Sequence, residues 1–320
     1  MLRSKLVVVT QLLLVCLTCG AVHAEDLRLG IVGTDSSHSV QFARILNNTS
    51  APNHIADAKI VMAYRGGNPR LALSRDRIEA FTAELEKTWA IPFVSSIHDL
   101  CPNVDGILIL SVDPTARLRE FKEAATCHKP IFIDKPAAST VDDVLAIDQL
   151  AKQSGVLWFS ASALRFLQPA GDKAVLSADV WGPGELGTSA DGYPLDLAWY
   201  GIHSIDALSA AMGPGIAKVS RVHTKDNDVI TAIWDDGRVG TIHLIRPEAA
   251  FHIRLRFALG QTVDTDMKVD YAPLVAAIVR LVRDKTAPVT GSETLEVFAV
   301  MEAAQESMKH DGLSVTVKRY

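Results

Sequence analysis

The sequence predicts an α/β protein in two parts: an N-terminal domain with a doubly wound parallel sheet, then an α+β domain with a large, mostly antiparallel sheet. Two observations support this fold class. In the first half, short β-rich apolar runs alternate with amphipathic helical patterns, which implies right-handed crossovers and a parallel sheet. In the second half, several strand patterns follow one another directly, which implies antiparallel neighbours. The 320 residues are enough for two such domains.

The first 24 residues have the composition of a secretory signal peptide. Arg3 and Lys5 precede the apolar run LVVVTQLLLVCLTCGAV, and small residues lead up to Ala24. We expect cleavage after Ala24 and export to the periplasm or the extracellular space. A membrane anchor is the alternative, but the run has only about 17 residues. No later segment has 18 or more uninterrupted apolar residues, so we expect no membrane partner for the mature chain.

Residues 25–160 form the predicted parallel-sheet domain. Ligands of open α/β sheets bind beyond the carboxyl ends of the strands, so side chains that follow these strands are the first candidates for a site. Strands are expected at 27–33, 58–64, 104–112, 129–134 and 155–162, with helices between them, for example at 75–89 and 116–127.

Residues 161–320 form the second predicted domain. The segment DDGR at 235–238 reads as a hairpin turn between two of its strands. Strands are expected at 217–224, 228–237, 238–246 and 251–259, and two closing helices at 272–284 and 292–309.

Charge and cysteine content narrow the function. Loss of Arg3 and Lys5 from the 32 basic side chains leaves 30 against 37 acidic ones, a formal charge of −7, and no basic run has interleaved aromatic residues. We therefore expect no nucleic-acid partner. Cys101 and Cys127 remain after cleavage. Each lies near the end of a helix that leads into a neighbouring strand, so they could form a disulfide in an oxidising compartment.

The segment GIVGTDSSHS, residues 30–39, lies where the first strand leads into a helix. A Rossmann-type domain has the turn G-x-G-x-x-G here, but only Gly33 is present, and Asp35 and His38 stand at the second and third glycine positions. A carboxylate about 4 Å from a phosphate charge would cost on the order of 4 kcal/mol at an effective dielectric constant of roughly 20. The cost disappears if Asp35 turns away to cap the helix, a role that Ser36 or Ser37 could also fill.

Two further stretches carry candidate chemistry. Lys135 directly follows the strand that ends IFID, where it lies either beside a ligand or, as a solvated side chain, in an ordinary turn. The stretch WYGIHSIDAL carries His203 and Asp206, whose spacing of three puts both on one face of a helix. The alternative for this pair is a buried histidine satisfied by its aspartate.

Taken in order, these three stretches resemble the Gfo/Idh/MocA family of NAD(P)-dependent sugar and cyclitol dehydrogenases. The resemblance covers nearly all of the mature chain, to the closing ETLEVFAVMEAAQES and GLSV. The matching motifs are E/D-K-P, here Asp134, Lys135 and Pro136; G-x-H-x-x-D, here Gly201, His203 and Asp206; and the arginine of ALRF, Arg165.

The resemblance implies hydride transfer between a sugar-like carbinol and a nicotinamide cofactor, with His203 as acid–base residue and Lys135 as its electrostatic partner. It implies a substrate-binding or orienting role for Asp206, and a homo-oligomer. The implied cofactor-binding residues are Gly33, Thr34, Asp35, Ser36, Ser37, His38, Arg65, Ser111, Asp113 and Lys135; the implied substrate-binding residues are Lys135, Arg165, Tyr200, His203 and Asp206.

Two departures from the family pattern bear on the site. Trp199 stands where the family has an aspartate four residues before its histidine, so Asp196 or Asp206 would have to replace that carboxylate. The second strand ends in Tyr64 and Arg65 in place of the acidic residue that holds the ribose. Arg65 could bind a 2′-phosphate, which favours NADP, or could be an ordinary arginine in a polar turn.

Two functions remain open. The first is an exported oxidoreductase that uses NAD or NADP and acts on a sugar or related polyol; because such cofactors are scarce outside the cytoplasm, it would have to capture and recycle its cofactor. The second is the same fold without a cofactor, either a lyase or isomerase that uses Lys135 and His203 or a non-catalytic sugar-binding protein. Without an H-E-x-x-H motif, paired C-x-x-C motifs or G-x-S-x-G, a metalloprotease, a zinc ribbon or a serine hydrolase is not expected. No metal is predicted, and a site assembled from scattered residues such as His203, Asp206 and His243 is the alternative.

Overall fold

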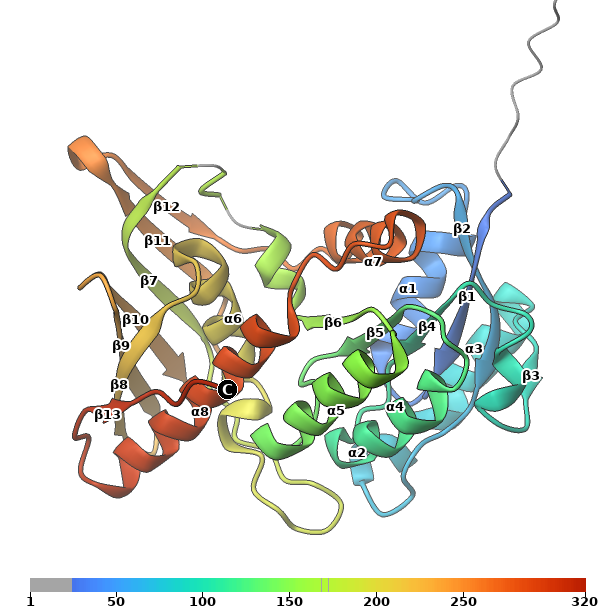
Figure 1. Cartoon of the computed structure of the whole chain (residues 1–320), viewed down its shortest axis with the longest axis horizontal. Helices are drawn as coiled ribbons and strands as arrows, with labels where there is room; N and C mark the ends of the chain where they lie inside the picture. The colour runs from blue at the N-terminus through green and yellow to red at the C-terminus, as the bar shows by residue number, and fades with distance from the viewer. Residues whose placement is uncertain (1–24, 168, 172) are drawn as a thin grey trace, which may run out of the picture.

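The computed structural model describes residues 25–167, 169–171 and 173–320, so the predicted signal peptide lies outside the described residues. The first sheet confirms the predicted doubly wound domain: it has six parallel strands in the order β3-β2-β1-β4-β5-β6 (Figure 1). Its strands are β1 (Leu27–Val32), β2 (Ala58–Tyr64), β3 (Phe93–Val94), β4 (Gly106–Ile109), β5 (Ile131–Asp134) and β6 (Trp158–Ala161).

The strand order reverses at β1 and β4, and a reversal of this kind opens a crevice at the carboxyl ends of the strands. Local sequence sets the connecting helices. The helix before β6 is capped at its N-terminus by Thr140, whose side chain accepts the backbone N–H of Asp143, and at its C-terminus by Gly155 in the left-handed conformation, φ 66°. The helices of this domain are α1 (Ser37–Asn47), α2 (Ala72–Arg75), α3 (Ile78–Trp89), α4 (Arg117–Ala125) and α5 (Val141–Ser154).

The second sheet has seven strands in the order β12-β11-β7-β10-β9-β8-β13. Its neighbours are antiparallel except β7 and β10, which run parallel, so the predicted mostly antiparallel sheet is confirmed. The strands are β7 (Val175–Pro183), β8 (Ile216–His223), β9 (Asn227–Trp234), β10 (Val239–Ile245), β11 (His252–Phe257), β12 (Thr262–Asp266) and β13 (Val315–Thr316).

The β9–β10 hairpin is the one that DDGR predicts: Gly237, with φ 85°, donates its N–H to the carbonyl of Trp234 at 3.0 Å. Strand β7 was not predicted. Its sequence, VLSADVWGP, contains serine, aspartate, glycine and proline, which weaken a strand pattern, yet it lies inside the sheet between β10 and β11.

The α-helices that follow in the chain are α6 (Gly201–Met212), α7 (Ala272–Asp284) and α8 (Gly291–Lys309). Helix α7 comes late in the chain but returns to the first sheet, where Leu274 and Ile278 share a buried cluster with Leu29 and Ile31 of β1. Figure 1 shows it beside α1. The return of α7 brings residues more than 200 positions apart to the same edge of the first sheet.

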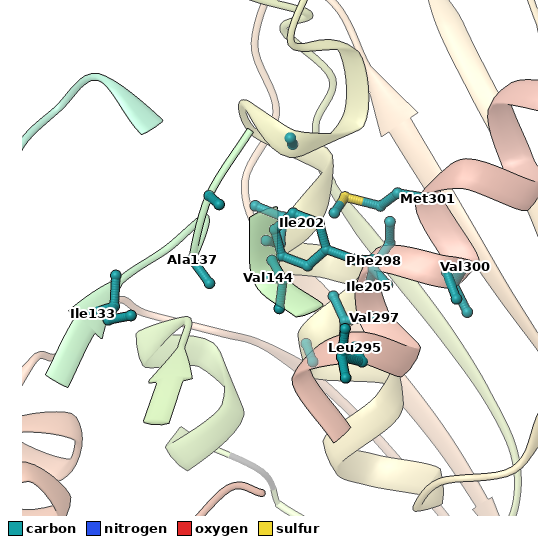
Figure 2. Packing of buried hydrophobic residues seen from close by; sticks show 14 of the residues in the cluster. Ile133, Ala137, Val144, Ile202, Ile205, Leu295, Val297, Phe298, Val300 and Met301 are labelled. Carbon is teal, nitrogen blue, oxygen red and sulfur yellow. The ribbon is translucent and has the colours of Figure 1, made fainter. Parts of the chain in front are cut away.

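Helix α8 fixes the position of α6 relative to the first domain. Val144 of α5, Ile202 of α6 and Phe298 of α8 are buried in one apolar cluster that continues into both sheets. Figure 2 shows these three side chains gathered together. Because this core is continuous, side chains at the start of α6 lie at a fixed distance from the loop that follows β5.

Cys101 and Cys127 form a disulfide, with sulfur atoms 1.98 Å apart. It joins the residue after the short helix His98–Leu100 to the segment after α4. Among the described residues no helix combines the length and the apolar character needed to cross a membrane.

Candidate active site

A cavity of about 330 Å³ opens at the carboxyl edge of the first sheet, between the two domains. The turn after β1 and the loop after β5 form one side of it, and residues at the start of α6 form another. Its lining includes the predicted residues Ser36, Ser37, His38, Lys135, Tyr200 and His203, together with the unpredicted Arg77, Arg117, Ser162, Trp199, Phe251 and Tyr271.

Gly33 is required at the turn after β1. Its φ is +87°, and a Cβ built on it would lie 2.4 Å from Oγ and 2.6 Å from Cα of Ser111. The N–H groups of Gly33 and Thr34 donate to the carbonyls of Tyr64 and Arg65 at 3.0 and 2.9 Å, so the turn continues the β1–β2 ladder. Thr34 is fully buried, and therefore neither it nor Gly33 presents a side chain to a ligand.

Asp35 turns away from the cavity. Its Oδ1 accepts the backbone N–H of Val112 at 3.1 Å, across the switch point, and the residue is only 1% exposed. Asp35 does turn away, but it does not cap its own helix, because its carboxylate accepts an N–H of the segment after β4 instead. Its Oδ2 has no hydrogen-bond partner among the described residues. The carboxylate of Asp35 is therefore held against the segment after β4 and is absent from the cavity lining.

Buried Arg117 organises the edge of the sheet, and sequence reasoning did not select it. Its Nη2 donates to the carbonyl of Ser111 at 2.6 Å, and its Nη1 donates to the carbonyls of Asp134 and Pro136. One side chain thus ties the carboxyl ends of β4 and β5 together. Its only signal in the sequence is its place in SVDPTAR, residues 111–117, directly after the fourth strand pattern.

Three residues implied in cofactor binding have other partners and do not line the cavity. Ser111 donates to buried Glu120 at 2.6 Å, and Asp113 accepts the side-chain amide of Asn68 at 2.7 Å. Burial raises the pKa of Glu120 to about 7. Arg65 is half-exposed and forms an ion pair with Glu79, which is more exposed still. Sequence placed these residues near the strand ends but could not give the direction of their side chains.

His38, at the third glycine position, faces the cavity and links two other elements. Its Nδ1 lies 2.6 Å from Oδ2 of Asp134, and its Nε2 lies 3.1 Å from Oη of Tyr271. Its ring stacks on Phe42, with centroids 5.6 Å apart and planes at 10°. Burial raises the pKa of Asp134, but His38, Arg117 and Lys135 outweigh burial and hold it at about 2, so this carboxylate is ionised at neutral pH.

Lys135 and His203 both line the cavity, the arrangement that the family resemblance implied. Burial lowers the pKa of Lys135 to about 8, against the opposing charge of Asp134. Its Nζ lies 5.5 Å from the centroid of the Tyr200 ring. Burial, followed by the charges of Lys135 and His38, lowers the pKa of His203 well below 6.5, so its imidazole is neutral at pH 7. Nδ1 of His203 lies 2.7 Å from Oγ of Ser162.

Asp206 and Arg165 lie behind this arrangement and are absent from the cavity lining. Oδ2 of Asp206 accepts the N–H of Ser162 at 2.7 Å, and its Oδ1 accepts Nε of Arg165 at 2.8 Å. Asp206 therefore influences His203 through Ser162. Asp196 does not replace the missing family aspartate either, because it is bound to Arg221 at 2.6 and 2.9 Å.

The cavity contains no obvious metal site. Within the part of the chain that the structure describes, no three His, Cys, Asp or Glu side chains are grouped as ligands of a metal ion. The chemistry available from the described side chains is proton transfer and electrostatic stabilisation by Lys135, His203, His38 and Tyr271.

No protein-family model matches the sequence, and no curated protein is found as a sequence relative. Solved structures do match the fold. A probable dehydrogenase from Thermotoga maritima gives a TM-score of 0.72 at 17% identity, over 91% of this chain and 99% of that one. Scyllo-inositol dehydrogenase from Lactobacillus casei, solved with NAD(H) and scyllo-inositol, gives 0.69 at 13% identity, over 92% and 99%. Myo-inositol 2-dehydrogenase from Lactobacillus plantarum gives 0.69 at 14% identity, over 92% and 100%. At these identities the chain shares the fold of these dehydrogenases.

Proposed function

We propose that the protein is an oxidoreductase that transfers a hydride between NAD or NADP and a carbinol of a sugar or related polyol. The observation that carries the proposal is the meeting of Lys135 and His203 on one cavity, at the carboxyl edge of the parallel sheet. The fold shared with inositol dehydrogenases over almost their whole length supports it. Fold alone licenses no reaction, so the argument rests on the site.

The residues on the cavity side of the turn fit a dinucleotide. Ser36, at the N-cap of α1, has a buried Oγ with no partner among the described residues, and Ser36 and Ser37 both line the cavity. The first N–H groups of a helix have no partner within it and attract anions, so these residues would hold the pyrophosphate. Asp35, which would repel it, accepts the N–H of Val112 and is absent from the cavity lining.

The chain's own groups would handle the proton and the developing charge. The neutral imidazole of His203 can accept the hydroxyl proton of the substrate, because Ser162 satisfies Nδ1 and no described residue bonds Nε2. The ammonium of Lys135 stabilises the alkoxide that forms. A bound nicotinamide ring supplies the acceptor of the hydride.

Arg65 favours NADP over NAD as the cofactor. Its ion pair with Glu79 is exposed, and such pairs contribute little to stability, so the guanidinium could leave Glu79 for a 2′-phosphate. Asp206 and Arg165 have a supporting role in this scheme, since they bind each other and hold Ser162.

The proposal includes export, with cleavage after Ala24, and a homo-oligomeric assembly. The disulfide between Cys101 and Cys127 supports an oxidising compartment, because such bonds are rare in the reducing cytosol of most organisms. An exported enzyme of this kind would retain its cofactor and recycle it on successive substrates.

A second candidate is a lyase, an isomerase or a sugar-binding protein that uses the same cavity without a cofactor. One observation favours it: the bond between Asn68 and Asp113 joins the loops after β2 and β4 across the end of β1, where a dinucleotide would lie. The N–H groups of Gly33 and Thr34 are also already bonded within the chain.

One experiment separates the two candidates. The mature protein is purified and denatured, any released NAD(H) or NADP(H) is identified, and the native protein is titrated with each cofactor. The oxidoreductase predicts bound nucleotide or saturable binding, followed by turnover of at least one inositol or sugar. The absence of both bound nucleotide and saturable binding at millimolar concentration would leave only the cofactor-free candidate.

A further inference from the structure

We propose that Trp199 and Tyr200 form an aromatic wall that selects the substrate, and that the substrate is a sugar whose ring is joined to a flat apolar group, as in an aryl glycoside. The inference rests on the proposed oxidoreductase function and names the chemical class of its substrate. In the sequence, Trp199 stands out only as a departure from the family pattern. In the structure it lines the cavity beside Tyr200.

The aromatic wall leads away from the proposed acid–base residue. The ring centroids of Trp199 and Tyr200 are 6.5 Å apart, and those of Tyr200 and His203 are 5.8 Å apart. Among the described residues, Trp199 has a ring contact with Tyr200 and none with His203. A substrate whose reacting carbinol meets His203 therefore presents its sugar ring to Tyr200 and its more distant part to Trp199.

Gly187, in the loop between β7 and α6, fixes the indole of Trp199. Its φ is +57°, and a Cβ built on it would lie 2.3 Å from Cγ and 2.5 Å from Cδ2 of Trp199. The glycine backbone thus packs directly against the pyrrole part of the ring. Asp196, three residues before Trp199, is held by buried Arg221 at 2.6 and 2.9 Å. Because the indole is held in place before a ligand arrives, little side-chain entropy is lost on binding.

The cavity has few acceptors for the hydroxyls of a large polyol. Among the described residues that line it, none is Asn, Gln or Glu, and Asp134 is the single carboxylate. Both oxygens of Asp134 are in use: Oδ1 accepts the backbone N–H of Lys135 at 2.9 Å, and Oδ2 bonds Nδ1 of His38 at 2.6 Å. A hydroxyl buried without a partner is costly, so the part of the substrate that meets Trp199 is apolar.

The polar groups of the cavity are gathered where the reaction needs them. Lys135 and Ser162 lie near His203, and this end of the cavity suits the carbinol and the hydroxyls beside it. A flat apolar group against Trp199 gains both burial and a ring–ring contact. Burial of a phenyl-sized group corresponds to roughly 10- to 100-fold in affinity. The aromatic wall therefore predicts a preference for a phenyl over a methyl substituent on the same sugar.

Calorimetric titration with phenyl and methyl glycosides of glucose, galactose and mannose tests the preference, with and without NAD or NADP. For at least one sugar we expect the phenyl glycoside to bind about tenfold tighter or more. Trp199→Ala should remove this difference by weakening only the phenyl glycoside, and Trp199→Phe should keep part of it. Trp181→Ala is the matched control, because Trp181 lies on β7 and is absent from the cavity lining.

Gly187→Ala tests the same contact without removing the indole. The new Cβ would displace the ring, so the phenyl glycoside should bind more weakly and the methyl glycoside as before, with melting temperatures to check folding.

Three outcomes would overturn the inference and leave the proposed function standing: equal wild-type affinities for phenyl and methyl glycosides of every sugar, equal losses of both in Trp199→Ala, or no binding of any glycoside at millimolar concentration. Tight phenyl glycoside binding by a protein that binds no nicotinamide cofactor would overturn the proposed function and leave the aromatic wall.

Discussion

The orientation of Asp35 yields the sharpest prediction about the cofactor. A carboxylate about 4 Å from a phosphate charge costs on the order of 4 kcal/mol at an effective dielectric constant of roughly 20, which corresponds to roughly a thousandfold in affinity. The carboxylate instead accepts the N–H of Val112, and the residue is 1% exposed. Near it, buried Arg117 carries the opposite charge. We therefore expect Asp35→Asn to tighten nicotinamide cofactor binding by less than about tenfold.

Asparagine keeps an oxygen that can accept the Val112 N–H, so this substitution isolates the charge. Asp35→Ala is the matched control: it also leaves a buried backbone N–H without a partner, and we expect the free energy of unfolding to fall by a further 1–3 kcal/mol or so. Cofactor dissociation constants come from calorimetric titration, and stabilities from urea denaturation. An affinity gain of two to three orders of magnitude in Asp35→Asn would mean that the carboxylate faces the phosphates, and the orientation described above would be wrong.

Three further predictions concern the cavity and the disulfide. His203→Ala should remove turnover while cofactor binding stays within about twofold, as measured by steady-state kinetics and titration; His243→Ala, on the second sheet, is its control, and full activity in His203→Ala would contradict the assignment. Because the Lys135 ammonium is needed and its pKa is about 8, activity should be present below that pH and be lost as pH rises through it, whereas a rate still rising at pH 9 would exclude this role. Replacing Cys101 and Cys127 by serine removes a cross-link between residues 26 positions apart and should lower the free energy of unfolding, measured in urea, by about 3 kcal/mol. Equal urea midpoints of the wild type with and without reductant would contradict this prediction.

The fold could be predicted because its signals are local. Alternating strand and helix patterns determine a parallel sheet whatever the details of packing, and DDGR determines its own hairpin. Strand β7 escaped detection because its polar residues give no clear alternation, and it forms an inner strand only through its neighbours β10 and β11. Strand β3 has two residues, too few for any pattern.

The site could be predicted only where a motif fixes both position and direction. Lys135 directly follows β5, and His203 lies near the start of α6. Both side chains line the cavity because β5 ends at it and α6 begins at it. Ser111 and Asp113 also follow a strand, but their side chains turn to Glu120 and Asn68, and sequence position does not encode that choice. The presence of Tyr271 in the site could not be predicted from the sequence, because it depends on the return of α7 to the first sheet.

The two residues that replace the glycines of the turn point in different directions and bond different segments. This argues against interpreting the turn as a degraded glycine-rich fingerprint. Asp35 points away from the cavity and bonds the segment after β4, while His38 points into the cavity and bonds Asp134. A glycine at position 38 would leave Oδ2 of Asp134 without this partner, inside a residue that is 3% exposed, and unpaired buried charge is costly. His38 and Asp134 therefore depend on each other. The turn keeps the glycine that the backbone requires, at Gly33, and gives the other two positions to side chains that build the edge of the cavity.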